Sequence, residues 1–293
     1  MGTLLINRLV IIGVGSIGGS LARALKKSQF VGKIVGCSRD EYHLKKAVEL
    51  GVIDAYDIDI GTAIRDADII VICAPVCSIS DVFKKISSGL SASTIVTDVG
   101  STKMSVIEAA KRVFGEVPPN FVPGHPIAGT EKSGVTASVS DLFQGRRVIL
   151  TPVNNTKATA VHSVREMWQQ TGAIVSEMDA VHHDEVLAAT SHLPHLLAYV
   201  LVDTLARMED KPEIFQYAAG GFKDFTRIAS SDPQMWHDIC LENSDPIIAM
   251  IDKYEVELKK IRAAVAKHDS NYIKTIFTRA KSARDDFCND SEL

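Results

Sequence analysis

The sequence predicts an α/β fold in which a Rossmann-type, doubly wound sheet is followed by an all-helical C-terminal domain. Between residue 8 and about residue 178, short apolar runs rich in β-branched residues alternate with helical stretches. Several runs are apolar on both faces, which is typical of strands in a buried parallel sheet. No further β-branched run follows Asp179. We therefore expect two domains, at residues 1–178 and 179–293.

The expected strands and helices alternate regularly through the first domain. Seven apolar runs are the expected strands: 8–13, 33–37, 68–74, 94–98, 120–124, 147–151 and 173–178. Helical stretches between them include 20–27, 78–88, 103–114 and 156–171. Ligands of a doubly wound sheet bind beyond the carboxyl ends of its strands. Residues 74–75, 98–101 and 124–126 follow such ends, so we expect them to meet at one site.

The second domain is expected to be helical throughout. Residues 180–208 are predicted to form one long helix with a kink at Pro194, because proline removes a backbone hydrogen bond. Beyond Asp245, apolar residues are spaced alternately by four and three, as in a heptad seam. They are Ile247, Ile251, Tyr254, Leu258, Ile261 and Val265. This seam fits packing within the domain and a dimer contact equally well.

Composition and charge exclude several classes of protein. The chain has 293 residues, of which 46% are hydrophobic and 23% charged, as in ordinary soluble proteins. Its net charge of −4 and scattered basic residues give no reason to expect nucleic acid. No apolar run reaches the length of a membrane span, and no signal peptide precedes the first strand. Five cysteines without a C-x-x-C pair indicate reduced thiols and a cytoplasmic location.

The first expected strand leads into a glycine motif that is typical of dinucleotide-binding sites. Gly13, Gly15 and Gly18 have G-x-G-x-x-G spacing between a strand and a helix. The first glycine makes the tight turn, the second lets the backbone approach a pyrophosphate, and the third allows close packing of helix on strand. Ser16 and Ile17 complete the turn, at a helix N-terminus that favours phosphate.

The end of the second strand favours NADP over NAD. Sites for NAD usually place Asp or Glu there to bind the ribose 2′-hydroxyl. Ser38 and Arg39 occupy that position, and a guanidinium suits a 2′-phosphate. A shift of one residue would instead bring Asp40 to the ribose. Ala74 and Pro75, which follow the third strand run, are also expected to contact the cofactor.

Four further segments carry a family resemblance. They are 98–103 (DVGSTK), 125–134 (HPIAGTEKSG), 191–195 (SHLPH) and 221–229 (GFKDFTRIA), and PQMW follows at 233–236. Together they closely resemble the prephenate/arogenate dehydrogenase family of tyrosine biosynthesis, from about Arg8 to Trp236. The chain departs from many members by having Lys223 where they have Arg. Ser38-Arg39 is similar to the NADP-using members.

The resemblance implies oxidative decarboxylation of a cyclohexadiene that carries a C4 hydroxyl group. Hydride leaves C4 for the nicotinamide, the hydroxyl loses its proton, and carbon dioxide departs as the ring becomes aromatic. By this resemblance His125 is the proton acceptor, and an ordinary histidine pKa of about 6.5 suits that task. Ser101 is expected to hydrogen-bond the C4 hydroxyl or His125.

Other motif residues are expected to bind the substrate. Arg227 is the candidate for a bidentate contact to a carboxylate. His192 and His195 lie three residues apart, on one face of the expected helix beside Pro194. The remaining candidates are Thr130, Glu131, Asp224 and Trp236. No metal is expected, because the histidine pair lacks H-E-x-x-H spacing and the nicotinamide carries the hydride chemistry.

Two other classes remain open at this point. A β-hydroxyacid dehydrogenase has the same domain plan, but that family relies on a lysine in the interdomain helix, and residues 179–210 contain none. An NADP-binding regulatory module would not need His125, Ser101 and Arg227 together. The choice between prephenate and arogenate also stays open, although Glu131 could pair with the ammonium group of arogenate. Two roles stay open for His183 and Asp184: they begin the helix, or they support the residues of the site.

Overall fold

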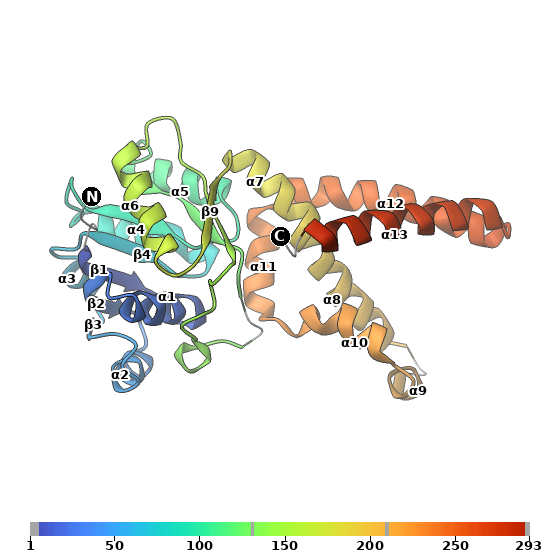
Figure 1. The fold of residues 1–293 in the computed structure, drawn as a ribbon, viewed down its shortest axis with the longest axis horizontal. Coiled ribbons are helices and arrows are strands. Elements are labelled where there is room, and N and C mark those ends of the chain that lie inside the picture. Colours follow the sequence, from blue (N-terminus) through green and yellow to red (C-terminus); the bar gives the residue numbers. More distant parts are fainter. Residues whose placement is uncertain (1–5, 130–131, 209–210, 291–293) are drawn as a thin grey trace. The chain divides into compact units, whose positions relative to one another are not determined.

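A six-stranded parallel sheet forms the centre of the N-terminal half in the computed structural model, which describes residues 6–129, 132–208 and 211–290 (Figure 1). Its strand order is β3-β2-β1-β4-β5-β6. The strands are β1 (Ile6–Ile12), β2 (Val31–Cys37), β3 (Ala55–Asp57), β4 (Ile69–Ile72), β5 (Ile95–Asp98) and β6 (Phe121–Val122). The order reverses between β1 and β4, where ligands bind in folds of this type. The predicted Rossmann-type sheet is confirmed.

Helices cover both faces of this sheet because alternate side chains of each strand point to opposite sides. In β1, Leu9 and Ile11 lie in one core while Val10 and Ile12 lie in the other. The first core includes residues of α1 (Ser16–Lys27), α2 (Glu41–Glu49) and α6 (Ala158–Gln169). The second includes residues of α3 (Ile60–Ala63), α4 (Ile79–Ser87) and α5 (Met104–Phe114).

Two of the expected strands, 147–151 and 173–178, do not extend the main sheet, whereas the expected strand 120–124 joins it as β6. β7 (Gly124–Pro126), β8 (Arg147–Leu150) and β9 (Ile174–Glu177) form a second sheet, in which β7 is antiparallel to β8 and β8 is parallel to β9. The expectation of a single layer through residue 178 is therefore wrong. Pro123 separates β6 from β7, and proline has no N–H to continue a ladder. The three-residue β3 was not expected either, because it is too short to show an alternating pattern.

The expected long helix of residues 180–208 is divided by a π-helical turn. α7 (Ala180–Leu187) leads into the turn η3 (Ala188–His192), and α8 (Leu193–Ala206) follows. Pro194 stands at the start of α8, where the lack of an N–H removes no hydrogen bond within that helix. The predicted irregularity at Pro194 is confirmed, and its form is a change of helix type. The shorter helices are η1 (Val76–Ser78), η2 (Val135–Ala137), α9 (Lys211–Gln216), α10 (Gly220–Thr226), η4 (Arg227–Ser230) and α11 (Pro233–Glu242).

The run Ala180–Ala206 is also the one described helix whose length and composition would allow it to cross a membrane. The expectation that no segment reaches this length is wrong by that measure. Polar residues such as His183 and Asp184 interrupt its apolar stretches in the sequence, so that no uninterrupted apolar run is visible. One such helix is weak evidence for a membrane protein, because core helices of soluble proteins have similar composition.

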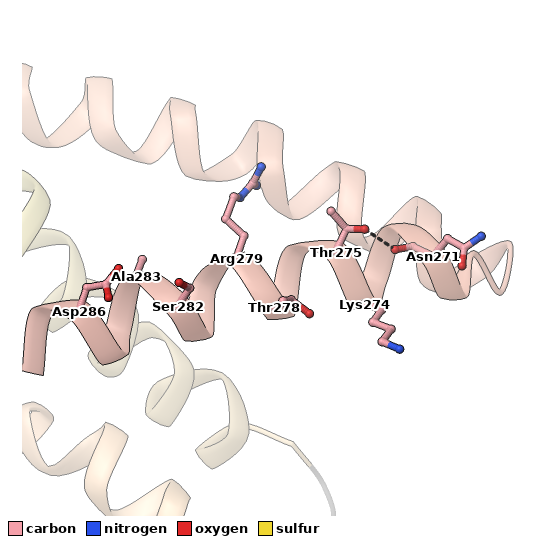
Figure 2. Close-up of a pocket in the computed structure, with 8 residues that line it drawn as sticks. All are labelled: Asn271, Lys274, Thr275, Thr278, Arg279, Ser282, Ala283 and Asp286. Atoms are coloured by element: carbon pink, nitrogen blue, oxygen red, sulfur yellow. Dashed lines mark hydrogen bonds between the residues drawn. The ribbon is translucent and has the colours of Figure 1, made fainter.

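The described chain divides into two compact units, Met1–Ser244 and Asp245–Leu293. The second unit is built from α12 (Ser244–Ala266) and α13 (Ser270–Asp290). In the predicted apolar seam of α12, Tyr254, Leu258 and Val265 are 42%, 52% and 57% exposed. Figure 2 shows the largely polar side chains along one face of α13, which line an open groove of about 830 Å³.

Candidate active site

The glycine turn after β1 has the geometry of a dinucleotide-binding site. Gly13 has φ of +99°, and a Cβ there would lie 2.5 Å from the carbonyl oxygen of Cys73. A Cβ on Gly18 would lie 2.4 Å from the carbonyl oxygen of Gly13. Around Gly15, in contrast, a Cβ would meet no protein atom within 4 Å. The fold itself therefore requires Gly13 and Gly18, whereas Gly15 leaves open space at the start of α1.

This open space lies where a phosphate would bind. Gly15 is the N-cap of α1 and supplies no side chain to its first turn, which begins with the half-buried Ser16 and Ile17. Backbone N–H groups at a helix N-terminus bind anions. The half-buried Ala74 and the exposed Pro75 follow β4, and the backbone of Cys73 and Ala74 lies directly against Gly13. The residues present fit a nicotinamide dinucleotide.

The structure separates the roles of three polar residues beyond β2. Asp40 caps α2, because its carboxylate accepts a hydrogen bond from the backbone N–H of His43. The hydroxyl oxygen of Ser38 accepts from the N–H of Asp40 at 3.3 Å. Arg39 is exposed and makes no hydrogen bond or ion pair with any residue in the described ranges. The carboxylate of Asp40 is thus engaged in its own helix, and the guanidinium of Arg39 is available.

A buried ion pair fixes the chain at the carboxyl end of β5. The ammonium group of Lys103 donates to the carboxylate of Asp98 and to the carbonyl oxygen of Gly124, the latter at 2.7 Å. Asp98 also accepts from the backbone N–H groups of Gly100 and Gly124, at 2.8 and 3.1 Å. Burial lowers the pKa of Lys103, and the charge of Asp98 opposes that shift. The pair therefore sets the position of Gly124, the residue before His125.

His125 is part of a buried series of three side chains. Its Nδ1 lies 2.9 Å from Nε2 of His183, and Nδ1 of His183 lies 2.8 Å from Oδ1 of Asp184. The carboxylate of Asp184 also accepts from the backbone N–H groups of Lys103 and Met104, at 2.7 and 2.8 Å. The capping residue of α7 is Asp179. His183 therefore contacts His125 directly, Asp184 contacts His183, and neither residue caps α7.

The pKa of His125 lies well below its ordinary value of 6.5. Burial is the main cause, since a charged imidazole loses hydration there. His183, Lys103 and His192 lower the pKa further. The ordinary pKa expected from the sequence is wrong, because burial of this ring depends on the tertiary packing. A lowered pKa keeps His125 neutral, and able to accept a proton, at more acidic pH than 6.5.

A second cluster gathers several of the expected substrate-binding residues. The rings of His195 and Trp236 are stacked, with centroids 3.6 Å apart and planes inclined by 19°. His192 meets Trp236 edge-on at 6.1 Å, and burial lowers the pKa of His192 to about 4. Arg227 is near enough to His195 to lower the pKa of that ring, although burial is the larger cause.

Asn243 connects the two groups of residues. Its amide nitrogen lies 2.9 Å from the carbonyl oxygen of Asp184 and 3.0 Å from Nδ1 of His192. Asn243 follows α11, the helix that carries Trp236. The cluster around Trp236 is thus joined by direct contacts to the series that contains His125.

Some expected residues are not joined to these groups. Ser101 is half-buried and has no hydrogen-bond partner among the described residues, so its expected contact with His125 is not made in this structure. Asp224 is exposed on α10. Thr130 and Glu131 lie outside the described residues. Among the residues that the structure does describe, no group of three or more potential ligands is arranged to hold a metal ion.

Three residues that contribute to the site were not predicted from the sequence. Asp98 and Lys103 were visible only as members of a motif, without a role of their own. The available signal was a lysine five residues after a strand-end aspartate. Asn243 carried no signal, because its partners lie 59 and 51 positions away in the sequence.

A separate cavity of about 440 Å³ lies at the amino ends of β5 and β6, away from these residues.

Comparison with protein families gives a clear result. Residues 21–177 match the nucleotide-binding domain of prephenate dehydrogenase, and residues 179–279 match its dimerization domain. The chain belongs to the prephenate dehydrogenase family. The suspected resemblance is confirmed, and the protein is an oxidoreductase with a nucleotide-binding domain. This result decides among the three classes that the sequence left open.

Individual relatives are similar along almost the whole chain. A cyclohexadienyl dehydrogenase of Zymomonas mobilis is 38% identical over 281 residues, which are 95% of each chain. The structure of an Aquifex aeolicus prephenate dehydrogenase with hydroxyphenyl propionate and NAD⁺ has a TM-score of 0.90 at 38% identity, and covers 97% of this chain and 99% of that one. A Synechocystis arogenate dehydrogenase has a TM-score of 0.81 at 25% identity, with coverage of 96% and 99%.

Two glycine variants separate folding from cofactor binding. Gly15→Ala is expected to leave the melting temperature nearly unchanged while raising the Kd for the dinucleotide, because its methyl group meets only the space for phosphate. Gly18→Ala is expected to lower the melting temperature, because its Cβ would overlap the carbonyl of Gly13. Thermal unfolding and cofactor titration measure both effects. A marked loss of stability in Gly15→Ala would contradict this assignment.

Proposed function

We propose that this protein catalyses the oxidative decarboxylation of prephenate, arogenate or both, with transfer of hydride to NADP, in tyrosine biosynthesis. The observation that carries the proposal is the buried His125, held by His183 and Asp184 at the carboxyl edge of a dinucleotide-binding sheet. The products would be 4-hydroxyphenylpyruvate from prephenate and tyrosine from arogenate. Family membership supports this reaction.

His125 acts as the general base in this proposal. When bound, the nicotinamide supplies the acceptor for the hydride from C4 of the substrate. His125 accepts the proton of the C4 hydroxyl group as the carbonyl forms, and its lowered pKa keeps it neutral for that purpose. Ser101, whose hydroxyl has no partner in the described protein, is available to hydrogen-bond the same C4 hydroxyl.

The cluster around Trp236 binds the substrate in this proposal. Arg227 provides the cation for a substrate carboxylate. His192 and His195 have lowered pKa values and offer neutral hydrogen-bonding groups beside the indole of Trp236. Thr130, Glu131 and Asp224 remain proposed substrate contacts. Glu131 would favour arogenate over prephenate, because a carboxylate can pair with an ammonium group.

A direct assay tests the proposed reaction. The purified protein, mixed with NADP and prephenate, is expected to show rising absorbance in the NADPH band together with release of carbon dioxide. The same assay with arogenate gives the ratio of kcat/KM for the two substrates. No reduction of NADP or NAD with either substrate would refute the proposed activity.

NADP is the proposed cofactor because of the residues beyond β2. Asp40 is engaged as the cap of α2, so we do not expect it to bind the ribose in place of Ser38 and Arg39. The exposed guanidinium of Arg39 and the hydroxyl of Ser38 suit a 2′-phosphate. The Aquifex aeolicus relative was solved with NAD⁺, so the two cofactors are to be compared directly in this protein.

Arg39→Ala tests this choice of cofactor. The change is expected to weaken NADP by about 1.5–3 kcal/mol, the value of one hydrogen bond to a charged group, and to affect NAD little. KM values for both cofactors, measured at saturating prephenate, provide the comparison. Lys33→Ala, an exposed cation earlier on β2, is the matched control. An equal change in the two KM values of Arg39→Ala would rule out a contact with the 2′-phosphate.

His125→Asn tests the assignment of the base. Its kcat is expected to fall about 10²- to 10⁴-fold, the usual contribution of a general base. Because burial lowers the pKa of His125, the wild-type kcat should be lost only below pH 6.5, where the ring becomes protonated. This acid limb should be absent from the variant. A variant with near-normal kcat, or with the same acid limb, would move the role to His195.

We further propose that residues 1–178 bind the cofactor and that residues 179–293 bind substrate and form a homodimer. The match to a dimerization domain and the exposed apolar side chains of α12 support the dimer. Light scattering at micromolar concentration is expected to give twice the chain mass of 31.8 kDa. A monomer would contradict the proposal. We place the protein in the cytoplasm, where its five free thiols would stay reduced.

A further inference from the structure

His183 has two partners that together define where its hydrogen lies. Both oxygen atoms of Asp184 already accept backbone N–H groups, from Lys103 and Met104. An ionised carboxylate only accepts hydrogen bonds, so Nδ1 of His183 must donate to Oδ1 of Asp184. A neutral imidazole with its hydrogen on Nδ1 has a lone pair on Nε2. That lone pair faces Nδ1 of His125 at 2.9 Å.

His125 is constrained in the same way by its contact with His183. Its Nδ1 must donate to Nε2 of a neutral His183, which leaves the lone pair of His125 on its own Nε2. We propose that His183 is a positioning residue, which together with Asp184 holds His125 in the tautomer whose Nε2 accepts the substrate proton. This inference rests on the proposed function, because it concerns the base of that reaction.

The proton transfer balances without a further reactant. As hydride leaves C4, the O–H bond of the C4 hydroxyl breaks, and its electron pair becomes the second bond of the carbonyl. The proton passes to Nε2 of His125, which becomes a cation. Nε2 of His183 continues to accept from Nδ1 of that cation, and Asp184 stays ionised two side chains away. A hydrogen bond from an ionised donor is the stronger kind, so this contact offsets part of the cost of a buried cation on His125.

The surroundings disfavour a doubly protonated His183, which would donate hydrogen bonds to both Asp184 and His125. A cation on His183 would be fully buried, in direct contact with the ring of His125. His183 on α7, Lys103 before α5 and His192 in the π-helical turn act on His125 directly. Asp184 lies behind His183, and Asp98 at the end of β5 accepts from the N–H of Gly124. Of these, Lys103 already takes up Asp98 as its counter-ion. A second buried cation would have only Asp184 to offset it.

The geometry of the series is fixed from both sides by a single residue. The backbone N–H of Lys103 holds Asp184, and its ammonium group holds the carbonyl of Gly124, next to His125. Both ends of the contact between His125 and His183 are therefore tied to the same point of the chain. A positioning role requires this rigidity, because a tautomer is controlled only while the donor and acceptor stay in contact.

A matched pair of variants on α7 tests the role in catalysis. His183→Phe keeps a ring of similar size but removes both nitrogen atoms, so the kcat with prephenate is expected to fall about 10- to 100-fold. The KM for prephenate and the Kd for NADP should change little. His182→Phe is the control. The side chain of His182, next to His183 in the chain, is 62% exposed and should be replaceable without loss of kcat. Wild-type kcat in His183→Phe would overturn the inference.

The tautomers themselves can be observed in the wild-type protein. Long-range ¹H–¹⁵N correlation spectra of the histidine rings are expected to show hydrogen on Nδ1 in both His125 and His183 at neutral pH. Signals lost in His125→Asn are assigned to His125, and signals lost in His183→Phe are assigned to His183. Hydrogen on Nε2 of His125 would overturn the inference, and this measurement does not depend on whether His183→Phe folds. If the wild type failed to oxidise either substrate while the spectra showed the expected tautomers, only the proposed function would fail.

Asp184→Asn gives an independent reading of the same series. An amide that presents N–H to Nδ1 of His183 would reverse the tautomers of both rings and place hydrogen on Nε2 of His125. We expect the spectrum to change in this way and the kcat to fall. The double variant Asp184→Asn/His183→Phe should be no slower than the slower single variant, because both changes act through His125. If the losses in kcat of the two single variants added up in the double variant, the two residues would not act through His125 together.

Discussion

The buried ion pair of Lys103 and Asp98 is the contact on which the rest of the site depends. Removing two charges from water is costly, and the cost is offset here because backbone groups of Gly100 and Gly124 complete the hydrogen bonds of the pair. The pair joins the carboxyl end of β5 to the first residue of β7. It thereby spans the point where the chain leaves the main sheet for the second one, and it places His125 at that point.

The π-helical turn determines which faces of one helical run serve the site. α7 carries His183 and Asp184, whereas His192 lies in the turn and His195 in α8. A π-helical turn has an extra residue relative to an α-helix, so it shifts the faces presented before and after it. One continuous run can therefore bring His183 to His125 and His195 to Trp236. Pro194 makes this arrangement less costly, because the helix has no N–H to satisfy at that position.

Burial gives the site a particular electrostatic character. The pKa values of His125, His192 and His195 are all lowered, chiefly by burial, so these rings are neutral near neutral pH. Neutral rings can accept a proton or form directional hydrogen bonds without repelling a bound cation. The exposed Arg227 carries a positive charge close enough to His195 to lower the pKa of that ring. In the proposed reaction, Arg227 binds a carboxylate and His125 accepts a proton, so the two tasks fall to different side chains.

The sequence by itself determined the features that depend on neighbours in the chain. The glycine spacing, the alternation of β1 between two cores, and the motif around His125 are local patterns, and the structure bears out the fold that they predict. The tertiary structure alone decided the features that join distant segments. His183 lies 58 residues from His125, and Asp184 lies 81 residues from Lys103. No local pattern records such contacts, nor the burial that lowers the pKa of His125, because both arise only when the helices and sheets pack together.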